Sequence, residues 1–169
     1  MTFHRLALLT TLLATSAACS GSPRDTLQAV RSALNPPPPP PDTIPEMLDY
    51  AADLRVNVAD MAKLPDGVLW LDLAPGDSLA EPAAGGDSVE VKFTGWMPNA
   101  VLVDSGTAAF RVGSGAVIGG IDVAIPGMRV GGRRQLVIPP SLAYGAEGRG
   151  DIPSNMVLVY EVELTRLIR

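Results

Sequence analysis

The nineteen residues from Gly127 to Gly145 read GMRVGGRRQLVIPPSLAYG and constrain the fold more than any other stretch. The pair Gly131-Gly132 is typical of a tight turn, and the residues after it alternate as in a strand, with Leu136 and Ile138 on one face. Two prolines then end the strand, because proline cannot donate to a hydrogen-bonded ladder. The stretch therefore predicts a turn, a half-buried strand and a loop that carries Tyr144.

Three further runs of alternating apolar residues lie on either side of this stretch. They cover Val68 to Leu73, Ser88 to Phe93 and Met156 to Leu167. Between Gly119 and Pro126 the chain has room for a helix of only about two turns. We therefore expect an α+β fold in which a mainly antiparallel sheet with one apolar face wraps around one short helix.

The start of the chain has the pattern of a secretory signal peptide. A short positive segment at His4 and Arg5 precedes an apolar run from Leu6 to Leu13 and small residues up to Ala18. The apolar run is too short to span a bilayer comfortably. We expect residues 1–18 to be removed during export.

Cys19 is the only cysteine of the chain, so it can form no internal disulfide. It directly follows Ser16-Ala17-Ala18, which is similar to the acylation signal of bacterial lipoproteins, although Ser16 stands where that signal usually has Leu. We expect Cys19 to carry the lipid of a lipoprotein that faces the periplasm or the cell exterior, with the outer membrane as the favoured location. The alternative is plain cleavage, which would leave a soluble periplasmic protein with a free thiol.

Residues 19–42 are expected to form a tether between this anchor and a folded domain. They are rich in Ser, Gly, Ala and Pro, and Pro36 to Pro41 are unbroken. Six prolines in polyproline II span roughly 19 Å at about 3.1 Å per residue, which makes a stiff spacer. A motif for a proline-binding partner is the lesser alternative.

Residues 43–64 do not fit one type of secondary structure. Their apolar residues suggest a helical stripe in the first half, yet Leu54, Val56 and Val58 alternate as in a strand. We expect an N-terminal extension that packs on a domain formed by residues 65–169.

Composition and charge exclude several kinds of function. The chain carries 13 Lys and Arg against 18 Asp and Glu, a net charge of −5 that would become −6 once residues 1–18, with their one arginine, are removed. Such a balance speaks against a nucleic-acid partner. The cluster Arg129, Arg133 and Arg134 is accordingly interpreted as a solvated hairpin face and not as a binding patch.

The chain also lacks the residues of several common active sites. Its only histidine, His4, lies in the predicted signal peptide, and its only cysteine is Cys19. The exported chain would have no histidine base, no Cys–His pair and no zinc site built from those residues, and we expect no metal and no cofactor. The glycine-rich segment 113–119 lacks the spacing of a phosphate-binding loop.

Asp104-Ser105-Gly106 resembles the motif of aspartic proteases, in which two such carboxylates share a proton. Val117-Ile118-Gly119 even imitates a later element of those enzymes. The separation of about fourteen residues leaves no room for the intervening hairpin, and the chain holds one copy of the motif only. A protease of this kind would need a dimer and is a remote third interpretation.

Several motifs occur in a fixed order between residues 93 and 164. They are Phe93-Thr94-Gly95-Trp96, Val103-Asp104-Ser105, the run from Phe110 to Gly120, Ile152-Pro153 and Glu161-Val162-Glu163-Leu164. Together with the opening stretch, they resemble the motifs of the FKBP-type peptidyl-prolyl cis-trans isomerases. The resemblance covers about residues 65–168 and implies the FKBP-like fold, an antiparallel sheet wrapped around one short helix.

The resemblance implies an enzyme that needs neither a nucleophile nor a cofactor. An X-Pro bond interconverts over a barrier of about 18–20 kcal/mol without any bond being broken, so a dry pocket that grips proline and stabilises the twisted amide suffices. By the family pattern, the amide of Ile118 would hold a substrate carbonyl, Tyr144 would offer its hydroxyl, and Asp104 would polarise the wall beside the proline. The apolar lining would be Phe93, Val103, Val117, Ile121, Ile152 and Tyr160.

The chain departs from this family pattern at several pocket positions. Ile121 replaces a tryptophan, Val103 a phenylalanine, Phe93 a tyrosine and Ala108 another aromatic residue. The segment between Asp104 and Phe110 is also about five residues shorter than usual, and the loop over 146–151 about one shorter. Because each aromatic side chain buries about 150–250 Å², we expect a shallower pocket with slower catalysis and weak binding of macrocyclic inhibitors.

Two interpretations follow. In the first, the protein is a monomeric, membrane-anchored prolyl isomerase that acts on proline-containing segments of exported proteins. In the second, the same fold binds peptides as a chaperone module and has largely lost catalysis.

Overall fold

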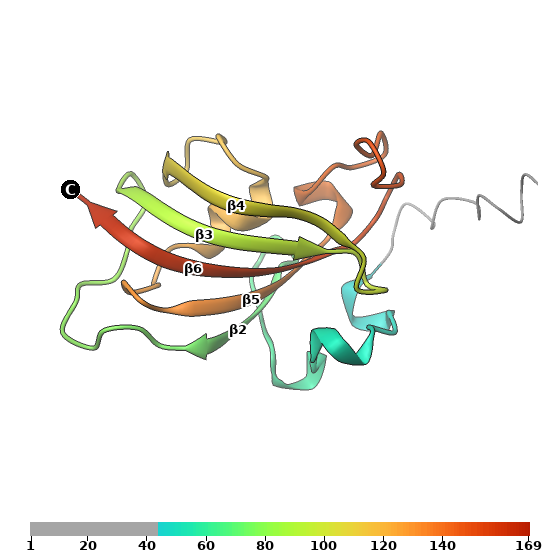
Figure 1. Ribbon diagram of the computed structural model, residues 1–169, viewed down its shortest axis with the longest axis horizontal. Coiled ribbons are helices and arrows are strands. Elements are labelled where there is room, and N and C mark those ends of the chain that lie inside the picture. Colours follow the sequence, from blue (N-terminus) through green and yellow to red (C-terminus); the bar gives the residue numbers. More distant parts are fainter. Residues whose placement is uncertain (1–43) are drawn as a thin grey trace, which may run out of the picture. The chain divides into compact units, whose positions relative to one another are not determined.

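The computed structural model describes residues 44–169, which belong to the second of two units into which the chain divides, Pro38–Arg169 (Figure 1). The predicted signal peptide, Cys19 and the proline run lie outside the described residues. Six antiparallel strands form one sheet in the order β1-β2-β5-β6-β3-β4. The strands are β1 (Ala62–Lys63), β2 (Leu69–Ala74), β3 (Ser88–Trp96), β4 (Leu102–Arg111), β5 (Arg133–Ile138) and β6 (Leu158–Ile168). One short helix, α2 (Gly119–Ala124), precedes β5 in the chain.

The face of the sheet that packs against α2 forms the main core. Alternating residues of β3, β5 and β6 lie on this face, and each is at most 1% exposed: Val89, Val91, Leu136, Ile138, Leu158, Tyr160, Val162 and Leu164. The alternation that the sequence predicts for these strands is thereby confirmed. The helix approaches β5 closely at Gly120, where a Cβ atom would lie 2.2 Å from Cγ2 of Ile138. Only glycine allows this contact.

The N-terminal extension covers part of the opposite face. It contains three short 3₁₀ turns, η1 (Pro45–Met47), η2 (Ala52–Leu54) and η3 (Val58–Asp60), and ends in the two-residue strand β1. Neither the helical stripe nor the strand-like alternation of Leu54, Val56 and Val58 is realised. Leu54 packs with Leu69, Val137, Val157 and Val159 in a second core cluster. Strand β5 is therefore buried on both faces, and the half-buried strand expected from its alternation was only partly correct.

Arg134 does not belong to a solvated hairpin face, and that interpretation was wrong. The residue is 5% exposed, and its guanidinium lies 4.1 Å from the ring centroid of Trp70. It donates to both carboxylate oxygens of Asp72, at 2.6 and 3.1 Å. It also donates to the carbonyls of Ala124 and Pro126 at 2.7 and 3.3 Å, where α2 ends. Arg134 thus ties the end of the helix to the sheet.

Candidate functional site

Two adjoining cavities lie between the start of α2, strands β3, β4 and β6, and the loop after Tyr144; we call them the inner and the outer cavity, and together the cleft. The inner cavity has a volume of about 340 Å³ and the outer one of about 400 Å³. The inner cavity is lined by Phe93, Asp104, Ala108, Gly115, Ala116, Val117, Ile118, Ile121, Tyr144, Arg149 and Tyr160. The outer cavity is lined by Met97, Val101, Leu102, Val103, Asp104, Tyr144, Arg149, Gly150, Asp151 and Ile152.

The structure brings all the residues that the sequence suggested as a site into this cleft. Val103 and Ile152 line the outer cavity, while Asp104 and Tyr144 line both cavities. The others line the inner cavity: Phe93, Val117, Ile118, Ile121 and Tyr160. Their placement is observed, whereas the role of each in substrate binding or catalysis stays a prediction.

A β-bulge directs Asp104 and Val103 to the cleft. The pairing of β3 with β4 shifts between Gly95, which opposes Asp104, and Trp96, which opposes Leu102, so that Val103 is the extra residue. A bulge interrupts the alternation of side chains and can turn two successive residues toward one side. Asp104 can therefore line both cavities, while the adjacent residue Val103 lines the outer cavity and also packs against the core.

Tyr160 forms the deep wall of the inner cavity. A Cβ atom at the opposing residue Gly95 would lie 2.4 Å from Cζ of Tyr160, so only glycine leaves room for the ring. The ring of Phe93 packs beside it, with ring centroids 6.2 Å apart. Burial, followed by the nearby Tyr144 hydroxyl and Asp104 carboxylate, raises the pKa of Tyr160 well above its usual value. Its hydroxyl therefore stays protonated at physiological pH.

The opposite wall is held by Asp122 of α2, which is 7% exposed. Its Oδ1 accepts the N–H of Gly113 at 2.7 Å, and its Oδ2 accepts the N–H of Gly115 at 2.9 Å. Both glycines have positive φ, 86° and 70°, a conformation that other residues rarely adopt. The loop continues directly into Ala116, Val117 and Ile118, so Asp122 positions this wall without lining the cavity.

Two polar groups of the cleft, the Ile118 amide and the Tyr144 hydroxyl, belong to residues beside short helical elements. Ile118 precedes α2 as its N-cap residue, and no hydrogen bond of its N–H is found within residues 44–169. Tyr144 follows the turn η4 (Pro140–Leu142). Its carbonyl accepts the N–H of Gly148 at 3.1 Å, and the N–H of Gly145 donates to Pro140 at 2.9 Å. These hydrogen bonds hold the backbone that carries the Tyr144 ring, and the Ile118 amide lies at the start of α2.

Sequence reasoning missed Arg149, which lines both cavities. Its guanidinium lies 5.5 Å from the ring centroid of Tyr144, within the range of a cation–π contact. The backbone of Arg149 pairs with Ile152 through two hydrogen bonds of 3.0 and 2.9 Å, which close the loop tip. The only signal in the sequence was an arginine between Gly148 and Gly150, and a loop position of this kind does not reveal which cavity it borders.

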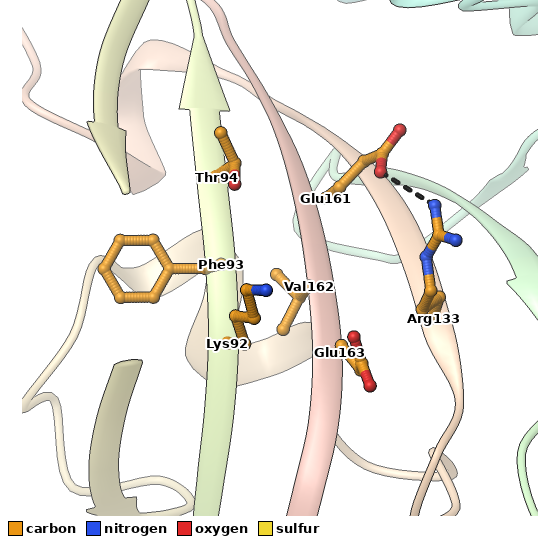
Figure 2. Close-up of a pocket in the computed structure, with 7 residues that line it drawn as sticks. All are labelled: Lys92, Phe93, Thr94, Arg133, Glu161, Val162 and Glu163. Carbon is orange, nitrogen blue, oxygen red and sulfur yellow. Dashed lines mark hydrogen bonds and ion pairs between the residues drawn. The ribbon is translucent and has the colours of Figure 1, made fainter. Parts of the chain in front are cut away.

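A third cavity, of about 270 Å³, lies on the other side of the sheet (Figure 2). Its charged rim comes from three neighbouring strands: Lys92 of β3, Glu161 and Glu163 of β6 and Arg133 of β5. Arg133 and Glu161 form an exposed ion pair at 3.1 Å. Alternating cross-strand charges of this kind are expected on a solvated sheet face, and the cavity shares only the core-facing Phe93 with the cleft.

Neither a metal-binding cluster nor a membrane-spanning helix is found in the described part of the chain. Across residues 44–169, no group of three or more His, Cys, Asp or Glu side chains is arranged to hold a metal ion. No helix in the same range has the length and apolar character needed to cross a bilayer.

Comparisons with known proteins agree with the fold. The profile of the family described as FKBP-type peptidyl-prolyl cis-trans isomerase matches residues 80–165. The chain is 42% identical over 104 residues to peptidyl-prolyl cis-trans isomerase FKBP15-3 of Arabidopsis thaliana, covering 59% of this chain and 73% of that protein. It is 43% identical over 94 residues to FK506-binding protein 2 of Dictyostelium discoideum, covering 52% and 71%. Of the longer FKBP53 of Arabidopsis thaliana it spans only 22%.

Solved structures with a similar fold include peptidyl-prolyl cis-trans isomerases as well. A peptidyl-prolyl cis-trans isomerase from Pseudomonas syringae pv. tomato superposes with a TM-score of 0.59 at 34% identity, covering 70% of this chain and 87% of that one. FkpA from Escherichia coli superposes with a TM-score of 0.57 at 29% identity, covering 64% and 52%. Within residues 44–169, the antiparallel sheet and the short helix α2 agree with the fold expected from the sequence. The chain belongs to the FKBP-type peptidyl-prolyl cis-trans isomerase family.

Proposed function

We propose that this protein is a prolyl isomerase that acts on X-Pro bonds of exported polypeptides from a lipid anchor at a membrane. The observation that carries the catalytic part is the convergence of Asp104, Ile118 and Tyr144 on one cleft whose walls are otherwise mostly apolar. These residues come from β4, the start of α2 and the loop after η4, and no local feature of the sequence requires them to meet.

The geometry of the cleft fits the chemistry of amide rotation. The transition state has a twisted C–N bond that has lost its resonance, and it is favoured by removal of water from the carbonyl. Proline would enter the inner cavity against Ile121 and Tyr160, which are 4% and 1% exposed. The free N–H of Ile118 and the Tyr144 hydroxyl would donate to substrate carbonyls, and Asp104 would favour the positive end of the twisted amide.

We expect the aliphatic residues of this pocket to give slower catalysis than the aromatic residues of the family pattern. Ile121 and Ala108 line the inner cavity and Val103 lines the outer one, so fewer aromatic faces are available to enclose proline. The groups expected to donate hydrogen bonds to the substrate, the Ile118 N–H and the Tyr144 hydroxyl, match the family pattern. Loss of apolar contact weakens binding of ground state and transition state alike, so we expect a raised KM more than a lowered kcat.

The Tyr144 hydroxyl is expected to contribute to the rate. Tyr144→Phe should lower kcat/KM for an X-Pro tetrapeptide about fivefold to tenfold, because one hydrogen bond contributes about 1 kcal/mol. A protease-coupled or NMR exchange assay measures this. The matched control is Tyr50→Phe, which removes a hydroxyl that donates to Pro45 at 2.6 Å outside the cleft. Equal rates for Tyr144→Phe and wild type would remove this hydroxyl from the mechanism.

The anchor rests on the sequence alone and has its own test. Mass spectrometry of the membrane-bound protein should find an N-terminal peptide that begins at Cys19 and carries acyl chains, because several such chains would hold the protein firmly at a bilayer. Cys19→Ala should release the protein into the soluble fraction. An unmodified Cys19, or a mature chain that starts elsewhere, would disprove the lipoprotein assignment.

A further inference from the structure

Strand β4 forms one edge of the sheet, and its ladder with β3 is unbroken over eight residues. Arg111 opposes Ser88, and every following pair keeps the register until Asp104 opposes Gly95. Within residues 44–169, no other strand pairs with β4. The segment that is short relative to the family pattern, between Asp104 and Phe110, therefore runs straight along the edge.

The register shows which backbone groups of β4 face outward. The N–H of Val112 donates to the carbonyl of Asp87 at 2.9 Å, so this pair is a hydrogen-bonded one. Hydrogen-bonded and non-hydrogen-bonded pairs alternate along an antiparallel ladder. Asp104, Gly106, Ala108 and Phe110 accordingly direct their N–H and C=O groups toward β3. The groups that point away from the sheet belong to Ser105, Thr107 and Ala109.

Within residues 44–169, nothing pairs with this outward edge. Ser105, Thr107 and Ala109 are exposed, and no backbone hydrogen bond of residues 103–110 to a group outside the ladder is found within the described chain. Natural sheets usually protect an edge with lysine, proline or a bulge. Residues 104–110 contain neither lysine nor proline, and the one bulge lies before them at Val103. A straight, unprotected edge of this length is suited to pairing with an additional strand.

The edge is continuous with the cleft. Asp104 and Ala108 alternate with the outward-facing residues and line the inner cavity, so a strand added to β4 would lie about 4.8 Å from it, beside the mouth of that cavity. We propose that β4 binds an extended segment of a client polypeptide by strand addition while a proline of the same client occupies the inner cavity. This inference rests on the proposed isomerase function.

The chemistry of the edge favours an unfolded polypeptide as the occupant. Strand addition uses main-chain groups, which every unfolded segment offers, and the small side chains of Ser105, Thr107 and Ala109 exclude few sequences. The cleft then selects proline. A tetrapeptide is too short to occupy cavity and edge together, so the edge should affect long clients only.

The test compares Thr107→Pro with Thr107→Ala in the full-length protein. Proline removes the outward N–H without breaking a bond to β3, whereas alanine changes the side chain and keeps the N–H. Thr107→Pro should reduce kcat/KM about tenfold for a reduced, carboxymethylated protein whose refolding is limited by a prolyl bond. Its rate with an X-Pro tetrapeptide, and both rates of Thr107→Ala, should stay within twofold of wild type.

The possible failures are distinguishable. If wild type accelerates neither substrate, the isomerase function itself is wrong. If Thr107→Pro acts normally on both substrates, the strand-addition proposal is wrong. If wild type sediments as a dimer and Thr107→Pro as a monomer, the occupant is a second copy of the chain, which also contradicts the proposal. If Thr107→Pro does not fold, hydrogen exchange of the wild type is measured instead. The amides of Ser105, Thr107 and Ala109 must exchange more slowly when the reduced, carboxymethylated client is added. Unchanged exchange would contradict the strand-addition proposal.

Discussion

Arg134→Ala is expected to lower the free energy of unfolding by about 3 kcal/mol. The substitution removes a bidentate contact to Asp72, the stacking on Trp70 and two hydrogen bonds from Nη1 to carbonyls at the end of α2. Because the Asp72 side chain is 39% exposed, the ion pair itself is partly screened by water. Most of the cost comes from the carbonyl of Ala124, which would stay buried without a donor.

Urea denaturation followed by circular dichroism measures this loss. Arg133→Ala is the matched control, because the neighbouring arginine is exposed and pairs with Glu161 at 3.1 Å on the outer face. That control should change the free energy of unfolding by less than about 1 kcal/mol. An effect of Arg134→Ala no larger than that of Arg133→Ala would show that the end of α2 is held in some other way.

Asp122→Asn is expected to lower kcat/KM for an X-Pro tetrapeptide at least about tenfold, although Asp122 lines neither cavity. The amide side chain keeps the shape of aspartate but retains only one acceptor oxygen. It would therefore leave the N–H of Gly113 or Gly115 facing an NH₂ group, and the loop that carries Val117 and Ile118 would lose its fixed position.

The matched control for this prediction is Asp77→Asn. Asp77 also accepts a backbone N–H, from Leu79 at 2.9 Å, but in an exposed turn that does not border the cleft. The control should leave kcat/KM unchanged. A purely structural role for Asp122 would lower the melting temperature without changing the kcat/KM of the fraction that remains folded at low temperature, and that outcome would contradict a positioning role.

Local sequence patterns predicted the elements whose environment is simple. The alternation in β3 and β6 and the room for one short helix were sufficient, because one face of these strands meets α2 and the period of two reflects that contact directly. The resemblance to the FKBP family then suggested Asp104, Ile118 and Tyr144 as site residues. No periodicity in the sequence connects these three positions.

The features that the sequence did not predict depend on contacts between distant segments. Val137 is buried because the extension around Leu54 covers a face that the strand pattern assigns to solvent. Arg134 carries a charge in a run of polar residues, and only the position of the end of α2 shows why it is buried. Arg149 lies in a glycine-rich loop whose direction is set by its backbone pairing with Ile152.

We propose that the cleft between α2 and the sheet catalyses prolyl isomerisation. Exchange NMR on a tetrapeptide with one X-Pro bond, with and without the purified protein, tests it most directly. We expect an exchange rate that rises in proportion to protein concentration and that falls when Tyr144 is replaced by phenylalanine. An exchange rate equal to that of the free peptide, even at protein concentrations comparable to the peptide, would contradict it.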